Sequence, residues 1–251
     1  MWLRELTRRG DIAARVLCLP PAGAGAASFR SWAAELPDWL GAIALELPGH
    51  GVRAREQPLT EAADVLDDAL LAELADFGDR PLVLFGFSMG GLLGLALGRA
   101  LSRAGRPPAL LVAAACEGPA NVAVPAAGGP SDEEIVAMLR EHSSTPAEML
   151  ENPDYLRYLI PVLRADVTLS ASLAGPGEPL SCPILSYLGQ HDASVPAAAA
   201  ESWAECTTGG FGTRRFPGGH FFVLERAGEV VRQLVADIDT VLAGAARAGQ
   251  R

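Results

Sequence analysis

Residues 81–92 read Pro-Leu-Val-Leu-Phe-Gly-Phe-Ser-Met-Gly-Gly-Leu, and the prediction of the fold starts from them. The apolar run that opens this stretch predicts a short strand that is buried on both faces. From Met89 to Ala104, apolar residues recur at helical spacing and predict an amphipathic helix. The pentapeptide Gly-Phe-Ser-Met-Gly therefore lies where a strand turns into a helix, with Ser88 at its centre. This arrangement indicates a nucleophile elbow.

A serine in so tight a turn needs residues without side chains two positions away on each side, because strand and helix nearly touch there. The first turn of the helix also offers free backbone N–H groups to a negatively charged oxygen. A glycine-rich turn with an incidental serine is the simpler alternative. The strand before Ser88 and the helix after it argue against that alternative, so we expect Ser88 to be a nucleophile.

Composition limits the class of protein. The chain has 251 residues, 49% of them hydrophobic, and no linker divides it, so we expect a single domain over residues 1–251. All 20 basic residues are arginine. The lack of lysine excludes a phosphate-binding loop of the Gly-Lys-Ser/Thr type and a pyridoxal Schiff base, and no cofactor is expected. A formal net charge of −10 argues against a nucleic-acid partner.

Targeting and metal signals are also lacking. The longest apolar run, residues 109–116, is too short to span a bilayer, and charged residues at positions 4, 5, 8 and 9 argue against a secretory signal. We therefore expect a cytoplasmic protein with no membrane partner. The four cysteines are far apart and the four histidines form no His-x-His or His-x-x-x-His pair. We expect buried structural cysteines and no metal site.

Strand-like and helix-like segments alternate along most of the chain. Strands are predicted at residues 14–19, 43–47, 82–85, 109–116, 184–188 and 212–216. Helices are predicted at residues 28–36, 60–77 (with Thr60 as the N-cap), 89–104 and 196–206, and a last helix carries Val230 to Val241 before a frayed tail at 243–251. This alternation predicts an α/β fold with a mostly parallel sheet and helices on both faces.

The alternation stops between Glu117 and Pro183, where no strand is predicted. Helices are expected at about residues 131–142, from Thr145 or Pro146 to Leu150, and at about 153–173, the first with a capping box of Ser131 and Glu134. An insertion at about 117–183 is well placed to form a helical lid over the carboxyl ends of the strands. Its apolar residues either line an acyl pocket or pack the lid onto the body: Met138, Met149, Leu150, Tyr155, Leu159, Ile160 and Leu163.

A serine hydroxyl needs a base to take its proton, and the base needs an acid to orient it. In α/β-hydrolases the chain order is serine, acid, histidine, which removes His50. His142 lies at a helix end in the predicted lid, and His191 stands next to an acid in sequence, where it is poorly placed to be oriented by it. His220, in a glycine-flanked loop after the last strand, is the preferred base.

Two acids compete for the third position. Asp192 follows the first strand after the lid and is preferred, although aspartate is also a common turn residue. Glu117 is the rival, because it directly follows another core strand.

Several segments, spread over nearly the whole chain, carry a resemblance to a known family: Trp2-Leu3-Arg4, Ala22-Gly23, Ser28-Phe29 with Trp32, Pro48-Gly49, the pentapeptide around Ser88, Gly189 to Asp192, and Gly218-Gly219-His220-Phe221-Phe222. They resemble the type II thioesterases of polyketide and nonribosomal peptide biosynthesis, within the α/β-hydrolases. The resemblance implies Ser88 as nucleophile, Asp192 as acid and His220 as base.

The same resemblance implies that the backbone N–H groups of Ala22 and Met89 stabilise the oxyanion. Phe87 and Pro21 stand where the family usually has histidine, and Glu117 where it often has a basic residue.

The activity implied is hydrolysis of acyl thioesters on the phosphopantetheine arm of an acyl or peptidyl carrier protein, through an acyl-enzyme, to clear stalled or wrongly primed acyl groups. Two alternatives are a discrete chain-releasing thioesterase or ester hydrolase for one full-length product, and a non-catalytic hydrolase-fold binding protein. Carrier proteins are acidic, so docking on this acidic chain needs a local basic face. The candidates are Arg53, Arg55, Arg157 and Arg164.

Overall fold

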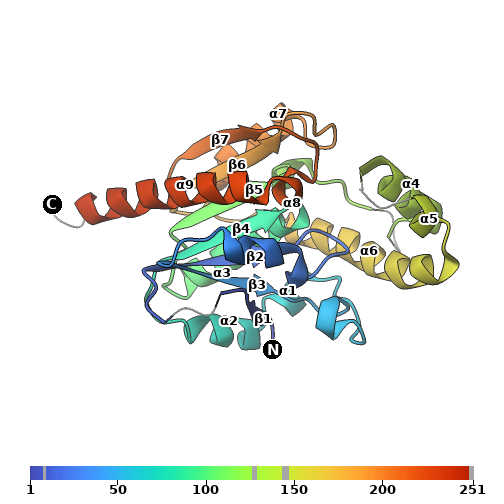
Figure 1. Ribbon diagram of the computed structural model, residues 1–251, viewed down its shortest axis with the longest axis horizontal. Helices are drawn as coiled ribbons and strands as arrows, with labels where there is room; N and C mark the ends of the chain where they lie inside the picture. The colour runs from blue at the N-terminus through green and yellow to red at the C-terminus, as the bar shows by residue number, and fades with distance from the viewer. Residues whose placement is uncertain (8–9, 126–128, 143–146, 249–251) are drawn as a thin grey trace.

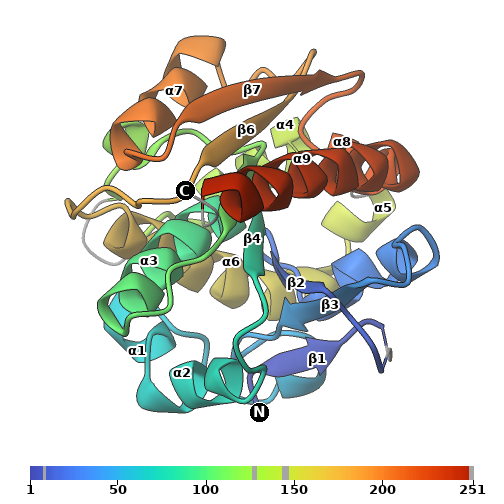
Figure 2. The same cartoon turned by 90° about the vertical axis from the view of Figure 1, so that its left-hand side faces the viewer.

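The computed structural model describes residues 1–7, 10–125, 129–142 and 147–248. Within these residues, seven strands form one sheet: β1 (Leu3–Glu5), β2 (Ala14–Leu19), β3 (Leu40–Leu45), β4 (Leu82–Phe87), β5 (Leu110–Ala114), β6 (Ile184–Gly189) and β7 (Phe211–Phe216). Their order is β1-β3-β2-β4-β5-β6-β7. β1 runs antiparallel to β3, and the other neighbours are parallel. The predicted α/β architecture is confirmed (Figures 1 and 2).

The inner strands send buried side chains to both faces of the sheet. In β2, Leu17 and Leu19 enter one apolar core, and Val16 and Cys18 enter the other. Figure 2 shows the sheet between α3 on one face and α9 on the other. Strands covered on both faces need apolar residues at consecutive positions, which is why they appear in the sequence as unbroken apolar runs.

Different helices close the apolar core on each face of the sheet. The first core is closed by α1 (Ala62–Val65), α2 (Asp68–Ala75), α3 (Met89–Arg103) and the end of α6, and the second by the 3-10 helix η1 (Ala26–Ala34) together with α8 (Phe222–Glu225) and α9 (Ala227–Ala248). Outside the insertion, the remaining described helices are η2 (Gly51–Arg53), α7 (Ala197–Glu201) and η4 (Ser202–Cys206), of which η4 adds Trp203 and Cys206 to the first core. The short 3-10 helix η3 (Pro119–Asn121) lies at the start of the insertion.

The single helix predicted over residues 60–77 is wrong, because α1 and α2 occupy this stretch. Leu66 leaves helical geometry, with φ −86° and ψ 38°. The carboxylate of Asp67 then accepts the N–H of Leu70 at 2.7 Å and caps α2. Aspartate is a strong N-cap because its side chain satisfies an N–H that has no helical partner, and this local bond starts a new helix. The N-cap residue of α1 is Glu61 rather than Thr60.

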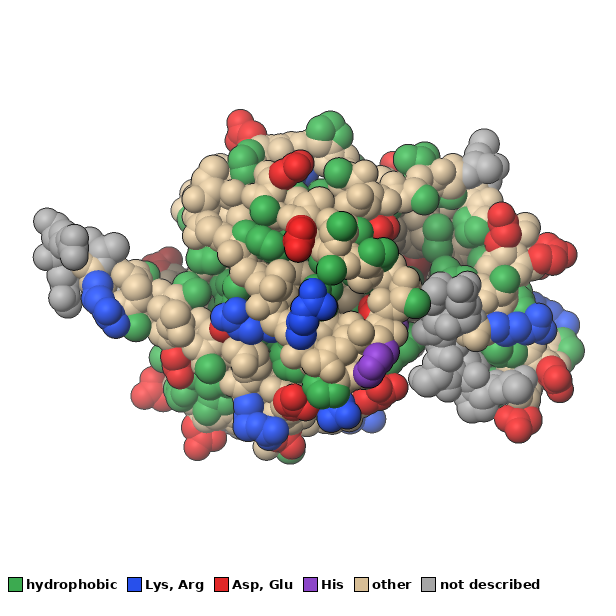
Figure 3. Space-filling model, turned by 90° about the horizontal axis from the view of Figure 1, so that it is seen from above, with side chains coloured by type: hydrophobic (Ala, Val, Ile, Leu, Met, Phe, Trp, Pro, Cys, Tyr) green, Lys and Arg blue, Asp and Glu red, His purple; other side chains and the backbone are tan. Residues whose placement is uncertain are grey.

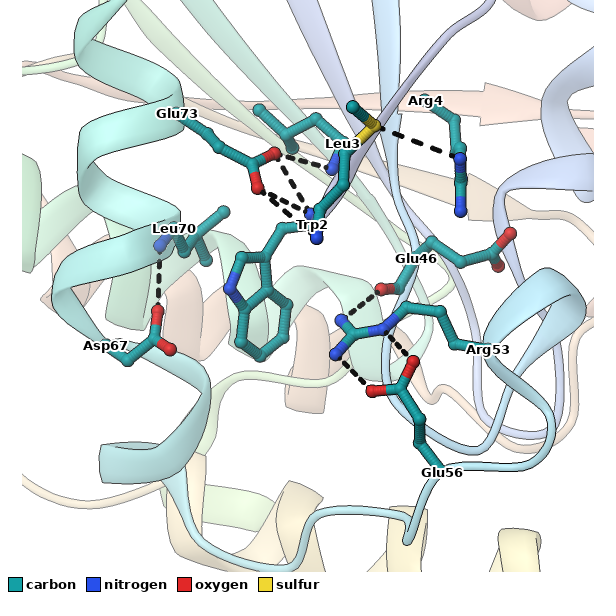
Figure 4. Close-up of polar contacts among 10 residues, drawn as sticks. Trp2, Leu3, Arg4, Glu46, Arg53, Glu56, Asp67, Leu70 and Glu73 are labelled. Atoms are coloured by element: carbon teal, nitrogen blue, oxygen red, sulfur yellow. Dashed lines mark hydrogen bonds and ion pairs between the residues drawn. The ribbon is translucent and has the colours of Figure 1, made fainter.

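Edge strand β1 has no counterpart among the predicted strands, because three residues are too few to show periodicity. Contacts from distant segments hold it in place (Figure 4). The carboxylate of Glu73, in α2, accepts the N–H groups of Trp2 at 2.8 Å and of Leu3 at 3.1 Å. The guanidinium of Arg53 lies 4.6 Å from the centre of the Trp2 ring and pairs with Glu56. Arg53, a predicted docking residue, is therefore engaged within the fold.

The insertion after β5 carries α4 (Asp132–His142), α5 (Ala147–Leu150) and α6 (Pro153–Leu173), which project from the body of the molecule (Figure 1). The predicted capping box is present at the start of α4. Ser131 Oγ accepts the N–H of Glu134 at 3.2 Å, and the Glu134 carboxylate accepts the N–H of Ser131 at 2.7 Å. The helices predicted here agree with the described extents of α4, α5 and α6, because caps and apolar spacing are local features of the sequence. The predicted start of the second helix, at Thr145 or Pro146, lies outside the described residues.

Six buried apolar residues of the insertion pack against one another and, at the margin of the group, against Ala22 of the body. They form a separate cluster of Ile135, Leu139, Leu150, Leu159, Ile160 and Leu163, with Met138 and Tyr155 at its margin. Helix α6 continues past this cluster, and Leu169 and Leu173 near its end pack into the core beside α3. One continuous helix thus joins the insertion to the body. Motion that keeps this packing is confined to α4, α5 and the start of α6.

The carboxyl-terminal helix is longer than the sequence predicts. Helix α9 continues to Ala248, whereas the sequence predicts a frayed tail from residue 243; residues 249–251 lie outside the described part of the chain. Residues 243–248 read Ala-Gly-Ala-Ala-Arg-Ala, and alanine is the best helix former. Among the described helices, none combines the length and the hydropathy needed to cross a bilayer.

Candidate active site

Ser88 lies at the sharp turn between β4 and α3. Its backbone angles, φ 53° and ψ −121°, fall outside the regions that residues with side chains prefer. A Cβ atom on Gly86 would lie 2.0 Å from the carbonyl oxygen of Gly90, and one on Gly90 would lie 2.1 Å from the carbonyl oxygen of Leu19. Both clashes are with backbone, which cannot turn aside. The turn therefore needs both glycines, for the steric reason that the sequence suggests.

The structure brings Ser88, His220 and Asp192 together from three loops. Oγ of Ser88 lies 3.2 Å from Nε2 of His220, and Nδ1 of His220 lies 2.8 Å from Oδ2 of Asp192. The carboxylate can only accept, so Nδ1 of the ring donates to it, and Nε2 of the neutral ring is left to accept the proton of Ser88. This is the alignment that a serine nucleophile requires.

Asp192 has a second partner that sequence reasoning missed. The N–H and the hydroxyl of Ser194 lie 3.0 Å and 2.5 Å from Oδ1 of Asp192, and the hydroxyl is also 2.9 Å from Nδ1 of His220. Burial alone would raise the pKa of Asp192, but the hydrogen bonds from His220 and Ser194 outweigh it and lower that pKa below its usual value. The available signal was the Asp-x-Ser spacing, which is typical of an Asx turn.

Aromatic rings and a close backbone approach surround the loop that carries His220. The ring of Phe87, at the end of β4, lies 5.7 Å from the imidazole, and the ring of Phe221 lies 5.4 Å from it. A Cβ atom on Gly189, at the end of β6, would lie 2.4 Å from the carbonyl oxygen of Gly219. The loops of Asp192 and His220 therefore run in direct backbone contact, and Phe87 forms an apolar wall beside the imidazole.

Glu117, the rival acid, borders the same cleft as Ser88 but has a different environment from Asp192. It is half-buried, and burial raises the pKa of its carboxyl group. Asp192 occupies Nδ1 of His220, so the geometry favours Asp192 as the orienting acid.

Two of the other histidines lie in surroundings unlike that of His220. His50 is buried, with Nε2 at 2.9 Å from Oδ2 of Asp166. His191 is exposed to solvent. The side chain of His142 lies outside the described part of the structure.

The backbone N–H groups of Ala22 and Met89 are the candidate oxyanion donors, and both residues border the cleft that contains Ser88. Met89 is the first residue of α3, so its N–H has no acceptor within the helix. Pro20 and Pro21 have no N–H, which makes that of Ala22 the first donor after β2. One N–H from a helix start and one from a facing loop suit a negative charge that develops on oxygen.

The cleft beside Ser88 has a volume of about 260 Å³ and a mostly apolar lining. Met138 of α4 and Val167 of α6 border it on the side of the insertion, and Leu92 of α3 on the side of the body. Of the lid residues expected to line an acyl pocket or pack the lid, Met138 borders the cleft. Within the described ranges, no group of three or more His, Cys, Asp or Glu side chains is arranged to hold a metal ion.

All four cysteines are free and buried, as predicted. Cys116 borders the cleft, but burial strongly raises the pKa of its thiol, so it stays protonated. It therefore contributes apolar surface and does not compete with Ser88 as a nucleophile.

Comparison with known proteins adds to this geometry. The family described as Thioesterase domain matches residues 14–238, a range that includes Ser88, Asp192 and His220. The chain belongs to this thioesterase family. The predicted enzyme class and the α/β-hydrolase fold are therefore confirmed.

Individual relatives of the thioesterase agree with this assignment. A probable cadicidin biosynthesis thioesterase of Streptomyces griseus is 30% identical over 225 residues, which cover 89% of this chain and 62% of that protein. The gramicidin S biosynthesis protein GrsT of Aneurinibacillus migulanus is 29% identical over 235 residues, 91% of this chain and 90% of that protein. The thioesterase thus spans less than two thirds of the first relative and nine tenths of the second.

A solved structure shows the same likeness over the whole fold. The type II thioesterase BorB from the borrelidin biosynthetic cluster has a TM-score of 0.81 and 29% identity, covering 94% of this chain and 97% of that one. The resemblance to the type II thioesterases of polyketide and nonribosomal peptide pathways is therefore confirmed.

Proposed function

We propose that the thioesterase removes acyl groups from the phosphopantetheine arms of carrier proteins, with Ser88 as nucleophile, His220 as base and Asp192 as the orienting acid. The proposal is carried by one observation, the hydrogen-bonded chain from Ser88 through His220 to Asp192 at the edge of an apolar cleft. A non-catalytic binding protein has no need for this alignment, so that alternative is disfavoured.

The first half of the reaction forms an acyl-enzyme. Oγ of Ser88 attacks the thioester carbonyl carbon while Nε2 of His220 takes its proton. The carbonyl oxygen becomes an oxyanion and accepts hydrogen bonds from the N–H groups of Ala22 and Met89. The tetrahedral intermediate then collapses, the carbon–sulfur bond breaks, and His220 returns the proton to the leaving pantetheine sulfur.

The second half releases the acid. His220 takes a proton from a water molecule, which attacks the carbonyl carbon of the acyl-Ser88 ester. After a second oxyanion has formed and collapsed, His220 gives the proton to Oγ of Ser88. The products are the free carboxylic acid and the regenerated enzyme. Throughout, ionised Asp192 stabilises the positive charge that His220 acquires in each half-reaction, a role that its lowered pKa supports.

The size of the cleft favours clearance of short acyl groups over release of a full-length product. Its volume of about 260 Å³ lies below the 300–1,000 Å³ that is usual for pockets holding drug-sized ligands. A complete polyketide or peptide chain is larger than such a ligand. Contact with an apolar lining contributes only about 0.8 kcal/mol per methylene, so we expect a graded preference among short and medium acyl chains.

The partner in this proposal is an acyl or peptidyl carrier protein. The named relatives belong to the biosynthesis of cadicidin, gramicidin S and borrelidin, and their resemblance to this chain supports carrier-bound substrates. Arginine and acidic side chains are interspersed on the face seen in Figure 3, so no large surface of one sign marks the docking position there.

One set of measurements tests the whole proposal. Hydrolysis rates are compared over acylated carrier proteins, acyl-pantetheine thioesters and simple oxygen esters, for the wild type and for Ser88→Ala. We expect carrier-bound thioesters to react fastest, Ser88→Ala to be inactive, and a serine-directed phosphonate to label Ser88 once. A phosphonate adduct mapped to another serine would overturn the assignment of the nucleophile. Faster hydrolysis of one large product ester would instead support the chain-releasing alternative.

A further inference from the structure

A second pair of titratable side chains is buried close to the proposed active site. His50, in the loop after β3, and Asp166, in α6, are 2% and 1% exposed, and Nε2 of His50 lies 2.9 Å from Oδ2 of Asp166. Neither residue has a role in the mechanism above. Burying two charged groups costs desolvation free energy that can exceed the attraction between them, so a buried pair is weak evidence for a stabilising role. The other groups that His50 and Asp166 contact indicate a different role.

Both ring nitrogens of His50 face acceptors. Nδ1 lies 3.0 Å from the carbonyl oxygen of Pro48, while Nε2 faces the Asp166 carboxylate. A neutral imidazole has only one N–H, so satisfying both acceptors requires the charged ring. Burial alone would lower the pKa of His50, but the hydrogen bonds to Asp166 and Pro48 and the charges of Asp166 and Glu46 raise it above its usual value. The pair is therefore an ion pair, with Glu46 as the other charged group acting on it.

The same carboxylate oxygen holds the loop that follows β2. Oδ2 of Asp166 accepts the N–H of Gly23 at 2.6 Å. Gly23 has a φ of 74°, and a Cβ atom there would lie 2.7 Å from Cδ2 of Leu163 in α6. Helix α6 thus packs directly on this loop while one of its own side chains binds the loop backbone.

Gly23 directly follows Ala22, one of the two proposed oxyanion donors. The N–H of Ala22 belongs to the peptide unit between Pro21 and Ala22, and the N–H that Asp166 binds belongs to the next peptide unit, between Ala22 and Gly23. Because peptide units are planar, only φ and ψ of Ala22 can change the orientation of one unit relative to the other. Downstream, the carboxylate of Glu46, 4% exposed, accepts the N–H of Ala26 at 3.0 Å. The loop is therefore bound at two N–H groups by buried carboxylates from other elements.

We propose that Asp166 and His50 are positioning residues that aim the N–H of Ala22 at the oxyanion and make its orientation depend on the seating of α6. Asp166 fixes the Gly23 peptide, and His50 supplies the positive charge and the N–H that hold the Asp166 carboxylate in place. If α6 moved off the body, the N–H of Gly23 would lose its acceptor and the oxyanion donors would lose their alignment. The inference rests on the proposed function, because it concerns the oxyanion of the Ser88 reaction.

The test compares Asp166→Ala and Asp166→Asn with the wild type on a short acyl-pantetheine thioester. Loss of one oxyanion donor lowers kcat by roughly 10² to 10³, so we expect Asp166→Ala to lower kcat by about 10², with KM changed less than about threefold. Asp166→Asn keeps an oxygen that can accept the N–H of Gly23 and should recover a substantial part of that loss.

A second readout follows the oxyanion directly. A trifluoromethyl ketone analogue of the same short acyl group adds to the serine and carries a negatively charged oxygen, as the tetrahedral intermediate does. The affinity of the analogue should be lower for Asp166→Ala than for the wild type, by the same factor as kcat/KM for the thioester. A purely structural role for the pair would lower the midpoint of thermal unfolding and leave both quantities unchanged in the folded protein.

Asp237→Asn is the matched control. Asp237, in α9, is also buried, and its carboxylate accepts a hydrogen bond from Tyr187 Oη at 2.6 Å and pairs with Arg214 at 2.6 Å. It is not among the residues that border the cleft. We expect this variant to lose stability and to keep the kcat and the analogue affinity of the wild type.

Wild-type kcat and analogue affinity in folded Asp166→Ala would overturn the inference. If that variant does not fold, amide exchange in the wild type decides: slow exchange at Gly23 is expected, and exchange as fast as that of an exposed loop amide would contradict the proposal. Failure of the proposed function looks different, because hydrolysis would then survive in Ser88→Ala. If Ser88→Ala is inactive while Asp166→Ala keeps full activity, the proposed function stands and only the positioning role of Asp166 is rejected.

Discussion

At the residue level, the reactivity of Ser88 depends on which acid orients His220. Oδ2 of Asp192 lies 2.8 Å from Nδ1 of His220, whereas Glu117 only borders the same cleft as Ser88 and His220. Changing Asp192 to Asn removes the charge that fixes the tautomer of the base, and in serine proteases this change lowers kcat by about 10⁴. We expect a loss of that order for Asp192→Asn and less than about threefold for Glu117→Gln in steady-state assays. A large loss in Glu117→Gln with an active Asp192→Asn would transfer the role to Glu117.

Asp192 should also make stability depend on acid. Its pKa is lower in the folded protein than in the unfolded chain, so its contribution to stability is present above the unfolded value near pH 4 and disappears as the pH falls through the folded value. The stability advantage of the wild type over Asp192→Asn should therefore shrink between about pH 5 and pH 3. Urea unfolding at several pH values measures it. An advantage that grows on acidification would show that the carboxylate is not stabilised by its hydrogen bonds.

At the level of elements, the turn from β4 to α3 depends on the absence of a side chain at Gly86. A Cβ atom there would meet the carbonyl oxygen of Gly90 at 2.0 Å, and neither backbone segment can move without shifting its element. We expect Gly86→Ala to lower the free energy of unfolding by about 3 kcal/mol or more, because overpacking against rigid backbone cannot relax through rotamers.

Gly244→Ala provides the control for that prediction. Gly244 lies in α9 and is exposed, and a Cβ atom added there would meet no atom within 4 Å. Alanine is favoured over glycine inside a helix by about 1 kcal/mol, so this variant should be as stable as the wild type or slightly more stable. Equal stability of the two alanine variants in denaturant unfolding would contradict the steric account of the elbow.

At the level of the whole molecule, docking of a carrier protein depends on arginines that are free to meet it. Arg164 is unsuitable for a test, because it contacts Asp132 and donates to the carbonyl oxygen of Pro130 at 2.8 Å within the insertion. Arg157, whose side chain is 79% exposed, pairs with exposed Asp154 at the surface. It can exchange this partner without disturbing the fold, since an exposed pair contributes about 1 kcal/mol or less.

We therefore expect Arg157→Glu to lower kcat/KM about fivefold on an acylated carrier protein and to leave that on the matching acyl-pantetheine unchanged. Added salt should narrow the difference between wild type and variant, because exposed charges are screened. Arg232→Glu, an exposed change on α9, makes the same change of charge away from the insertion and should behave as the wild type on both substrates. Equal losses in the two variants would point to net charge rather than to docking at α6.

Much of the fold could be predicted because its signals are local. Apolar runs marked β2 and β4, the cap at Ser131 marked α4, and the spacing of glycines around Ser88 marked the elbow, since each depends on residues within a few positions of one another. Chain order removed His50, and the positions of Asp192 and His220 after core strands then favoured them as acid and base, the residues that the structure brings to Ser88. Edge strand β1 was missed because three residues are too few to show periodicity and because the Glu73 carboxylate that binds it comes from a distant segment. The break between α1 and α2 was missed because it depends on one hydrogen bond, from the N–H of Leu70 to the carboxylate of Asp67.

The pairing of His50 with Asp166 was beyond reach of the sequence for a physical reason. The two residues stand 116 positions apart, and a contact between distant segments leaves no periodicity in either of them. Read alone, His50 is a turn residue and Asp166 a polar residue in an amphipathic helix. Only the seating of α6 against the loop after β2 buries both side chains, removes water from them, and gives one carboxylate oxygen the N–H of Gly23 and the ring of His50 as partners.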